Sequence, residues 1–183
     1  MGPPEPEQRF EAIYLAHYGA IATYVRRRTD SSDDIADVIA ETFTTAWRRI
    51  DDIPDGDEAR LWLYGVARRT LANHHRGQSR RAGLATRLRE EAADWAHSMP
   101  DRDSDAAYQA FKRLPDQDRE LLALVAWEGL SQPEIAKVLG CSRGALRIRL
   151  HRARKRLAKQ LAAAELDLTR YGAHAVALAE GQS

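Results

Sequence analysis

The sequence predicts an all-α protein made of two small helical domains joined by a flexible linker, with a helix-turn-helix in the second domain. Three observations lead to this prediction. Apolar residues recur every three or four positions in several segments, as they do along one face of an α-helix. A polar, proline-containing stretch over 83–105 separates two groups of such segments. A short helical pattern, a glycine turn and a basic helical pattern follow one another between Leu130 and Leu157.

The predicted N-terminal domain covers residues 1–82. Residues 1–7 are acidic and rich in proline, which predicts disorder. A helix is expected over 8–28, because apolar side chains there recur at helical spacing. The residues expected on its inner face are Phe10, Ile13, Tyr14, His17, Ile21, Tyr24 and Val25.

The rest of this domain follows the same pattern. Ser31 and Asp34 have the spacing of a helix N-cap, and a helix with Trp47 on its apolar face is expected from there to about Ile50. The segment DDIPDGD at 51–57 has turn chemistry and predicts a polar loop. A third amphipathic helix is then expected over 58–78, which completes a compact helical domain.

The second half of the chain contains the predicted linker at 83–105, a C-terminal domain at 106–161 and a tail at 162–183 with no assigned role. Leu114-Pro115 is expected to end one helix, and Asp116 is expected to cap the next. The residues expected in the core of that next helix are Leu121, Leu122, Leu124, Val125 and Trp127.

The helix-turn-helix is the most distinctive local pattern. Ser131 and Glu134 form a capping box, Gly140 ends the short helix, and Ser142 can cap the basic one. The basic helix has a single apolar stripe at the spacing i, i+4, i+7 and i+11. Its members are Leu146, Leu150, Ala153 and Leu157.

The charge pattern indicates a polyanionic partner. The whole chain has a net charge of only +1, but nine Lys or Arg residues and no acid lie between Glu134 and Glu165. A solvated basic surface helix is the alternative, yet the turn chemistry, the stripe and the charge together favour DNA. The single cysteine, Cys141, excludes an internal disulfide and has no partner at zinc-ligand spacing. The sequence has no apolar run of membrane-spanning length and no signal peptide, so a cytoplasmic location is expected.

Two separated stretches resemble one known family. FKRLPDQDRELLALVAWEGLSQPEIAKVLGCSRGALRIRLHRARKRL resembles the −35-reading domain of bacterial extracytoplasmic-function (ECF) sigma factors, which are sigma-70-like proteins. DDIADVIAETFTTAWRRI followed by RLWLYGVARRTLANHHR resembles the N-terminal domain of the same family. The resemblance extends over most of residues 8–160 and keeps the order and spacing of both parts.

The resemblance implies three interfaces. Binding to the clamp helices of the largest subunit of core RNA polymerase is expected of Asp37, Glu41, Thr44, Thr45 and Arg48. Recognition and opening of the −10 promoter element, with Ile53 in a base-capturing loop, are expected of Arg49, Ile53, Arg68, Arg69, Arg76 and Arg80. Recognition of the −35 element is expected of Arg143, Arg147, Ile148, His151, Arg152 and Lys155. Ala40, Arg69 and Ile148 stand where relatives often have Gln, Asn and a small polar residue.

The expected function is therefore that of a transcription initiation subunit without catalytic residues, metal, cofactor or small-molecule substrate. The family also implies an anti-sigma factor as a partner. Such a partner could hold the protein at the membrane, and the active protein is expected on the nucleoid. A stand-alone helix-turn-helix regulator is the second interpretation, which predicts a palindromic site bound by the protein alone. An enzyme is the third, with a site at His74 and His75 or at the acidic clusters. It is disfavoured because adjacent histidines point to different sides of a helix and no third ligand lies at metal spacing.

Overall fold

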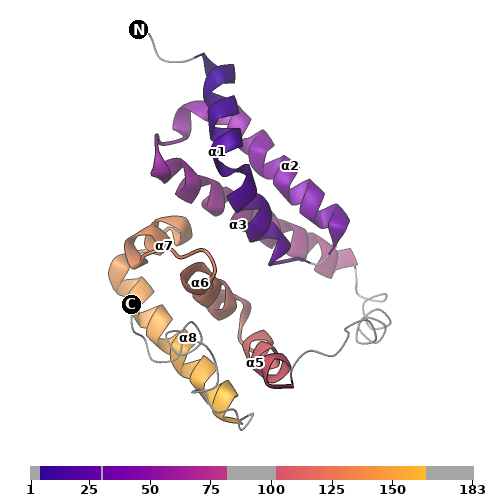
Figure 1. Cartoon of the computed structure of the whole chain (residues 1–183), viewed down its shortest axis with the longest axis vertical. Coiled ribbons are helices and arrows are strands. Elements are labelled where there is room, and N and C mark those ends of the chain that lie inside the picture. The colour runs from indigo at the N-terminus through magenta and orange to yellow at the C-terminus, as the bar shows by residue number, and fades with distance from the viewer. Residues whose placement is uncertain (1–4, 30, 82–101, 164–183) are drawn as a thin grey trace. The chain divides into compact units, whose positions relative to one another are not determined.

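The computed structural model describes residues 5–29, 31–81 and 102–163, and the side chains of 77–81 and 102–106 lie outside that description. The chain divides into two compact units, residues 1–91 and 92–183 (Figure 1). All regular structure in the described residues is helical, which confirms the predicted all-α fold class.

The first unit contains α1 (Pro6–Arg26), α2 (Ser32–Arg48), the 3-10 turn η1 (Ile50–Asp52) and α3 (Asp57–Arg81). Helix α1 packs against both α2 and α3, and α2 packs against α3 (Figure 1). The predicted apolar stripes meet in the centre of this three-helix arrangement. Its fully buried side chains include Ile21, Tyr24, Val25, Val38 and Leu63.

The helix ends differ from the prediction in ways that local chemistry explains. Helix α1 begins at Pro6, so the predicted disorder of residues 1–7 is wrong for Glu5, Pro6 and Glu7. Proline is compatible with the first turn of a helix, and an acid there complements the helix dipole. The expected cap of α2 is confirmed, because the backbone N–H of Asp34 donates to Ser31 Oγ at 3.3 Å.

The prediction that Tyr14 and Trp47 point into the core is wrong, since they are 37% and 43% exposed. Their rings pack sideways on neighbouring aromatic rings instead. The centroids of Tyr14 and Phe43 lie 4.8 Å apart, and those of Phe10 and Trp47 lie 5.4 Å apart. Aromatic pairs at such distances are stabilising even when one edge of each ring remains in water.

The second unit contains α5 (Arg102–Lys112), α6 (Asp116–Ala126), α7 (Gln132–Leu139) and α8 (Arg143–Ala163). Helix α8 packs against the other three. The start of α5 shows that the predicted linker ends too late, because residues 102–105 are already helical.

The connection between α5 and α6 is closed by Arg119. Its Nη1 donates to the carbonyls of Lys112 and Leu114, at 2.6 and 3.2 Å, and its Nη2 lies 2.5 Å from Asp116 Oδ1. The carbonyls at the end of α5 thereby gain partners that the helix itself cannot provide. The expected cap at Asp116 is wrong, because Pro115 is the N-cap residue and Asp116 pairs with Arg119.

Trp127 is a further correction in this unit. It was expected in the core, but it is the C-cap residue of α6 and is 43% exposed. Its ring packs against that of Phe111 with centroids 5.3 Å apart. The helical stripe of α6 ends before Trp127, so its side chain covers the edge of the core.

Candidate nucleic-acid interface

The turn between α7 and α8 has the predicted helix-turn-helix chemistry. The backbone N–H and the hydroxyl of Ser131 both donate to Glu134 Oε2, at 2.8 and 2.6 Å. Gly140 adopts a left-handed conformation (φ 62°, ψ 41°), and the N–H of Cys141 donates to Ala136 O at 3.0 Å. A left-handed glycine followed by such a bond ends a helix sharply. The next helix starts at once, because Ser142 Oγ accepts from the N–H of Ala145.

Helix α8 divides cleanly into a buried and an exposed face. The predicted stripe is buried, and Leu161 extends it by one further turn. All residues predicted to contact the −35 element are exposed: Arg143, Arg147, Ile148, His151, Arg152 and Lys155. Ile148 is 56% exposed and lies among these polar and charged side chains. We call these six residues the α8 face.

Two other cations of α8, Arg154 and Arg156, interact with the rest of the fold. Arg156 Nη1 lies 2.6 Å from Asp118 Oδ2 on α6, and the carboxylate side chain is only 12% exposed. Arg154 is partly buried, and this burial lowers its pKa. Arg156 therefore uses its charge within the fold, whereas the cations of the α8 face remain at the surface.

Three arginines interact electrostatically: Arg49 at the end of α2, and Arg68 and Arg69 in the middle of α3. The pKa of Arg69 is lowered by burial first, and then by the charges of Arg68 and Arg49. Arg49 Nε lies 2.8 Å from Asp52 Oδ2, and its guanidinium lies 5.8 Å from the centre of the Trp62 ring. Mutual repulsion at this arginine cluster (Arg49, Arg68 and Arg69) is relieved by an anion.

The loop before α3 differs from its predicted role. Ile53 was expected to capture a base, but its side chain is only 2% exposed and belongs to the core. Arg9 Nη2 donates to the Ile53 carbonyl and lies 3.0 Å from Asp55 Oδ1, so α1 holds the loop in place. An inward-facing isoleucine anchors the loop and leaves its polar groups outside.

The remaining residues predicted to contact the −10 element lie further along α3. Arg76 is exposed and folds back on its own helix, with Nη2 2.9 Å from Asn73 Oδ1. The side chain of Arg80 lies outside the described residues.

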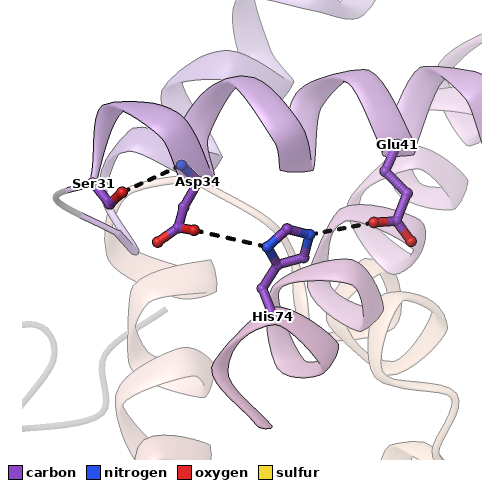
Figure 2. Close-up of polar contacts among 4 residues, drawn as sticks. All are labelled: Ser31, Asp34, Glu41 and His74. Atoms are coloured by element: carbon purple, nitrogen blue, oxygen red, sulfur yellow. Dashed lines mark hydrogen bonds and ion pairs between the residues drawn. The ribbon is translucent and has the colours of Figure 1, made fainter. Parts of the chain in front are cut away.

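The predicted polymerase-binding residues form a stripe along α2. Asp37, Glu41, Thr44 and Arg48 are exposed and recur at the spacing of one helical face, whereas Thr45 is partly buried beside them. We call Asp37, Glu41, Thr44 and Arg48 the α2 stripe. Glu41 does not stand alone, because His74 of α3 lies against it, as Figure 2 shows.

Four structural partners were missed by sequence reasoning: Arg9, His74, Asp118 and Arg156. Their contacts join positions 33 to 46 residues apart, at which no local spacing rule applies. Asp118 lies in the polar segment DQDRE at 116–120, so its sequence neighbours gave no sign of its burial. Within the part of the chain that the structure describes, no three His, Cys, Asp or Glu residues are grouped to hold a metal ion.

Comparisons with known proteins agree with this geometry. Residues 13–81 match the family model of sigma-70 region 2, and residues 104–157 match that of sigma-70 region 4. RNA polymerase sigma factor CnrH of Cupriavidus metallidurans is 30% identical over 167 residues, covering 85% of this chain and 87% of CnrH. RNA polymerase sigma factor YlaC of Bacillus subtilis is 28% identical over 157 residues, covering 82% of this chain and 91% of YlaC.

A solved structure is similar as well. The structure of CnrH in complex with the cytosolic domain of CnrY has a TM-score of 0.58 and 29% sequence identity, covering 84% of this chain and 88% of that chain.

A helical unit matching region 2, followed by a helix-turn-helix unit matching region 4, defines a promoter-recognition subunit of RNA polymerase. The chain belongs to the sigma-70 family, as an RNA polymerase sigma factor of the ECF type. It binds core RNA polymerase and directs initiation at specific promoters. No helix among the described residues is long and apolar enough to span a membrane.

Proposed function

We propose that this sigma factor divides its work among three surfaces: the α8 face reads the −35 element, the arginine cluster engages the −10 element, and the α2 stripe binds polymerase. The α8 face carries this proposal. This face exposes several cations and one isoleucine, while the leucine stripe on the other side of α8 is buried. The turn after α7 fixes where α8 starts. An exposed basic helix of this kind fits the major groove.

Direct readout is assigned to the centre of the α8 face. Arg147 and Arg152 can each donate two hydrogen bonds to a guanine, which contributes about 1–3 kcal/mol of discrimination. Ile148 offers only apolar contact, for which the methyl group of thymine is the fitting partner. Arg143 and Lys155 lie toward the ends of the face and are assigned to phosphates.

The −10 element is assigned to the arginine cluster and to the helix that follows it. Arg49, Arg68 and Arg69 concentrate positive charge beside the partly buried ring of Trp62. Cations next to an aromatic ring suit a single strand whose bases have left the stack. Arg76, which is exposed on α3, is assigned to a phosphate, and the same role is assigned to Arg80 from the sequence alone.

The α2 stripe is assigned to the clamp helices of the largest polymerase subunit. Its acids are exposed, and a partner of opposite charge would be attracted and oriented by them. Thr45 is assigned a peripheral contact because it is partly buried. Transcription initiation takes place where polymerase and DNA are found, so we propose a cytoplasmic location for the active protein. We also propose that the protein has no catalytic chemistry of its own.

An anti-sigma factor is proposed as a further partner. The similar structure of CnrH was solved with the cytosolic domain of CnrY bound, which supports a regulatory protein partner for this chain as well. A membrane-bound partner of this kind would also hold the inactive protein at the membrane.

Transcription in vitro tests the division of labour. With core polymerase and a promoter library, Arg152→Ala is expected to relax −35 sequence preference while leaving affinity for core polymerase unchanged. A combined Asp37→Ala and Glu41→Ala variant is expected to weaken core binding while leaving −35 preference unchanged. Equal effects of both variants in both assays would contradict the assignment. A lack of promoter-specific initiation, together with tight binding of the isolated protein to a palindromic duplex, would instead favour a stand-alone regulator.

A further inference from the structure

His74 connects the two helices that carry the polymerase and promoter surfaces. It lies on α3, and its ring stands between two carboxylates of α2 (Figure 2). Its Nε2 is 3.3 Å from Glu41 Oε2, and its Nδ1 is 3.9 Å from Asp34 Oδ1. The two acids are seven residues apart, which places them two turns apart on the same face of α2.

The ring is held more firmly than the acid that it touches. The His74 side chain is 25% exposed and that of Asp34 is 20% exposed, whereas that of Glu41 is 52% exposed. Asp34 is itself fixed near the start of α2, where its N–H donates to Ser31 Oγ (Figure 2). His74 therefore lies close to the first turn of α2 through Asp34 and to the α2 stripe through Glu41.

The position of Glu41 on α2 explains why a contact with His74 would favour one orientation of its carboxylate. Asp37 lies one turn before it, and like charges at that spacing repel each other. A glutamate on an exposed helix face also loses rotamer freedom when it binds. A hydrogen bond from His74 orients the carboxylate beforehand, so that less ordering remains when polymerase arrives.

We propose that His74 is a positioning residue for polymerase binding, which acts by holding the Glu41 carboxylate in its binding orientation. This inference rests on the proposed role of the α2 stripe. It gives helix α3, which is proposed to contact the promoter, a second role in polymerase binding.

The experiment measures the Kd of the full chain for core RNA polymerase. His74→Ala is expected to raise the Kd about two- to fivefold, the range expected from one partly exposed polar pair. His74→Gln is expected to bind like the unaltered protein, because its amide nitrogen reaches nearly the same place as Nε2. His75→Ala is the matched control, since His75 is the exposed neighbour on the same helix and should leave the Kd unchanged.

A double-mutant cycle separates positioning from a general structural effect. In a Glu41→Ala background, His74→Ala is expected to change the Kd no further, because the group that it orients is gone. Thermal unfolding and affinity for a −35 duplex are measured on every variant, and both should be unchanged by His74→Gln.

Two results overturn the inference while leaving the proposed function intact. One is an unchanged or lower Kd for His74→Ala when Glu41→Ala does weaken binding. The other is an equal effect of His74→Ala with and without Glu41. If Glu41→Ala leaves the Kd unchanged, the assignment of the α2 stripe fails, and this inference fails with it.

Discussion

Lys155 and Arg156 are neighbours on α8 that are expected to affect different properties of the protein. Lys155 is exposed on the α8 face. Arg156 instead pairs with Asp118 of α6 at 2.6 Å, and the side chains of these two residues are 55% and 12% exposed. The first cation is available to DNA, whereas the second compensates a carboxylate that the fold has removed from water.

Arg156→Met keeps the aliphatic part of the side chain and removes its charge. The carboxylate of Asp118 then stays mostly buried without this partner, and such a group costs about 1–3 kcal/mol. The loss should stay below the roughly 3–5 kcal/mol of a fully buried pair, because Arg156 itself is half exposed. Urea unfolding measures this loss, and hydrogen exchange of α6 and α8 locates it. Adding Asp118→Asn is expected to restore part of the stability.

Lys155→Met is the matched control on the same helix. Loss of one phosphate contact should reduce the slope of log K against log salt for a −35 duplex by about 0.9. The factor by which affinity falls between 50 and 200 mM salt would then be about 3.5 times smaller for Lys155→Met than for the unaltered protein. The free energy of unfolding should change by no more than about 0.5 kcal/mol, as is usual for a surface position.

The two variants refute the reasoning if their effects are exchanged or shared. A salt slope that falls as much for Arg156→Met as for Lys155→Met would place Arg156 on the DNA. An equal loss of stability in both would show that the Asp118 pair is unimportant. Binding is measured at a temperature at which both variants remain folded, so that unfolding does not imitate weak binding.

Four further predictions follow from single features. Burial and the charge of Arg60 lower the pKa of His17 from 6.5, so the unfolded chain takes up its proton first as pH falls. Urea midpoints should therefore decline as pH drops below about 6.5, and His17→Gln should flatten this decline. Gly140→Ala should destabilise by about 1–2 kcal/mol in denaturant titrations, because a side chain strains the left-handed backbone at φ +62°. The cost should not exceed this range, since the added Cβ meets no atom within 4 Å. Arg9→Gln should lower the free energy of unfolding by about 1 kcal/mol in denaturant titrations, since Arg9 bonds to the Ile53 carbonyl and to Asp55 and so holds the loop before α3. Replacing the contacted −35 thymine by uracil, which lacks the methyl group, should cost the unaltered protein about fourfold in affinity. It should cost Ile148→Ser nothing.

Much of the C-terminal unit was predictable because its signals are local. The pair Ser131 and Glu134, the glycine at 140 and the stripe from Leu146 onward act within one or two turns of the chain. Each specifies a cap, a stop or a face without reference to distant residues. The helix-turn-helix and the exposure of the α8 face follow from these signals.

The wrong predictions have a common physical cause. Periodicity shows which face of a helix is apolar, but not how far the neighbouring helices extend over it. Tyr14, Trp47 and Trp127 therefore remain partly in water although they continue apolar patterns. Ile53 failed in the opposite direction: it lies in a polar loop by sequence, yet the core takes up its side chain. Long-range polar contacts such as that of Arg9 depend on the tertiary structure itself, so sequence spacing could not reveal them.

The basic residues show how such contacts define the function. By sequence, the arginines near α8 form one undivided positive segment. In the fold, Arg156 binds Asp118 of α6, so its charge is used in holding the helices together. Arg147 and Arg152 are left exposed on the opposite side of the leucine stripe. The surface for DNA is thus what remains after structural pairing. The buried stripe determines which face of α8 is exposed, and the pairing of Arg156 with Asp118 commits one of its cations to the fold instead of the promoter.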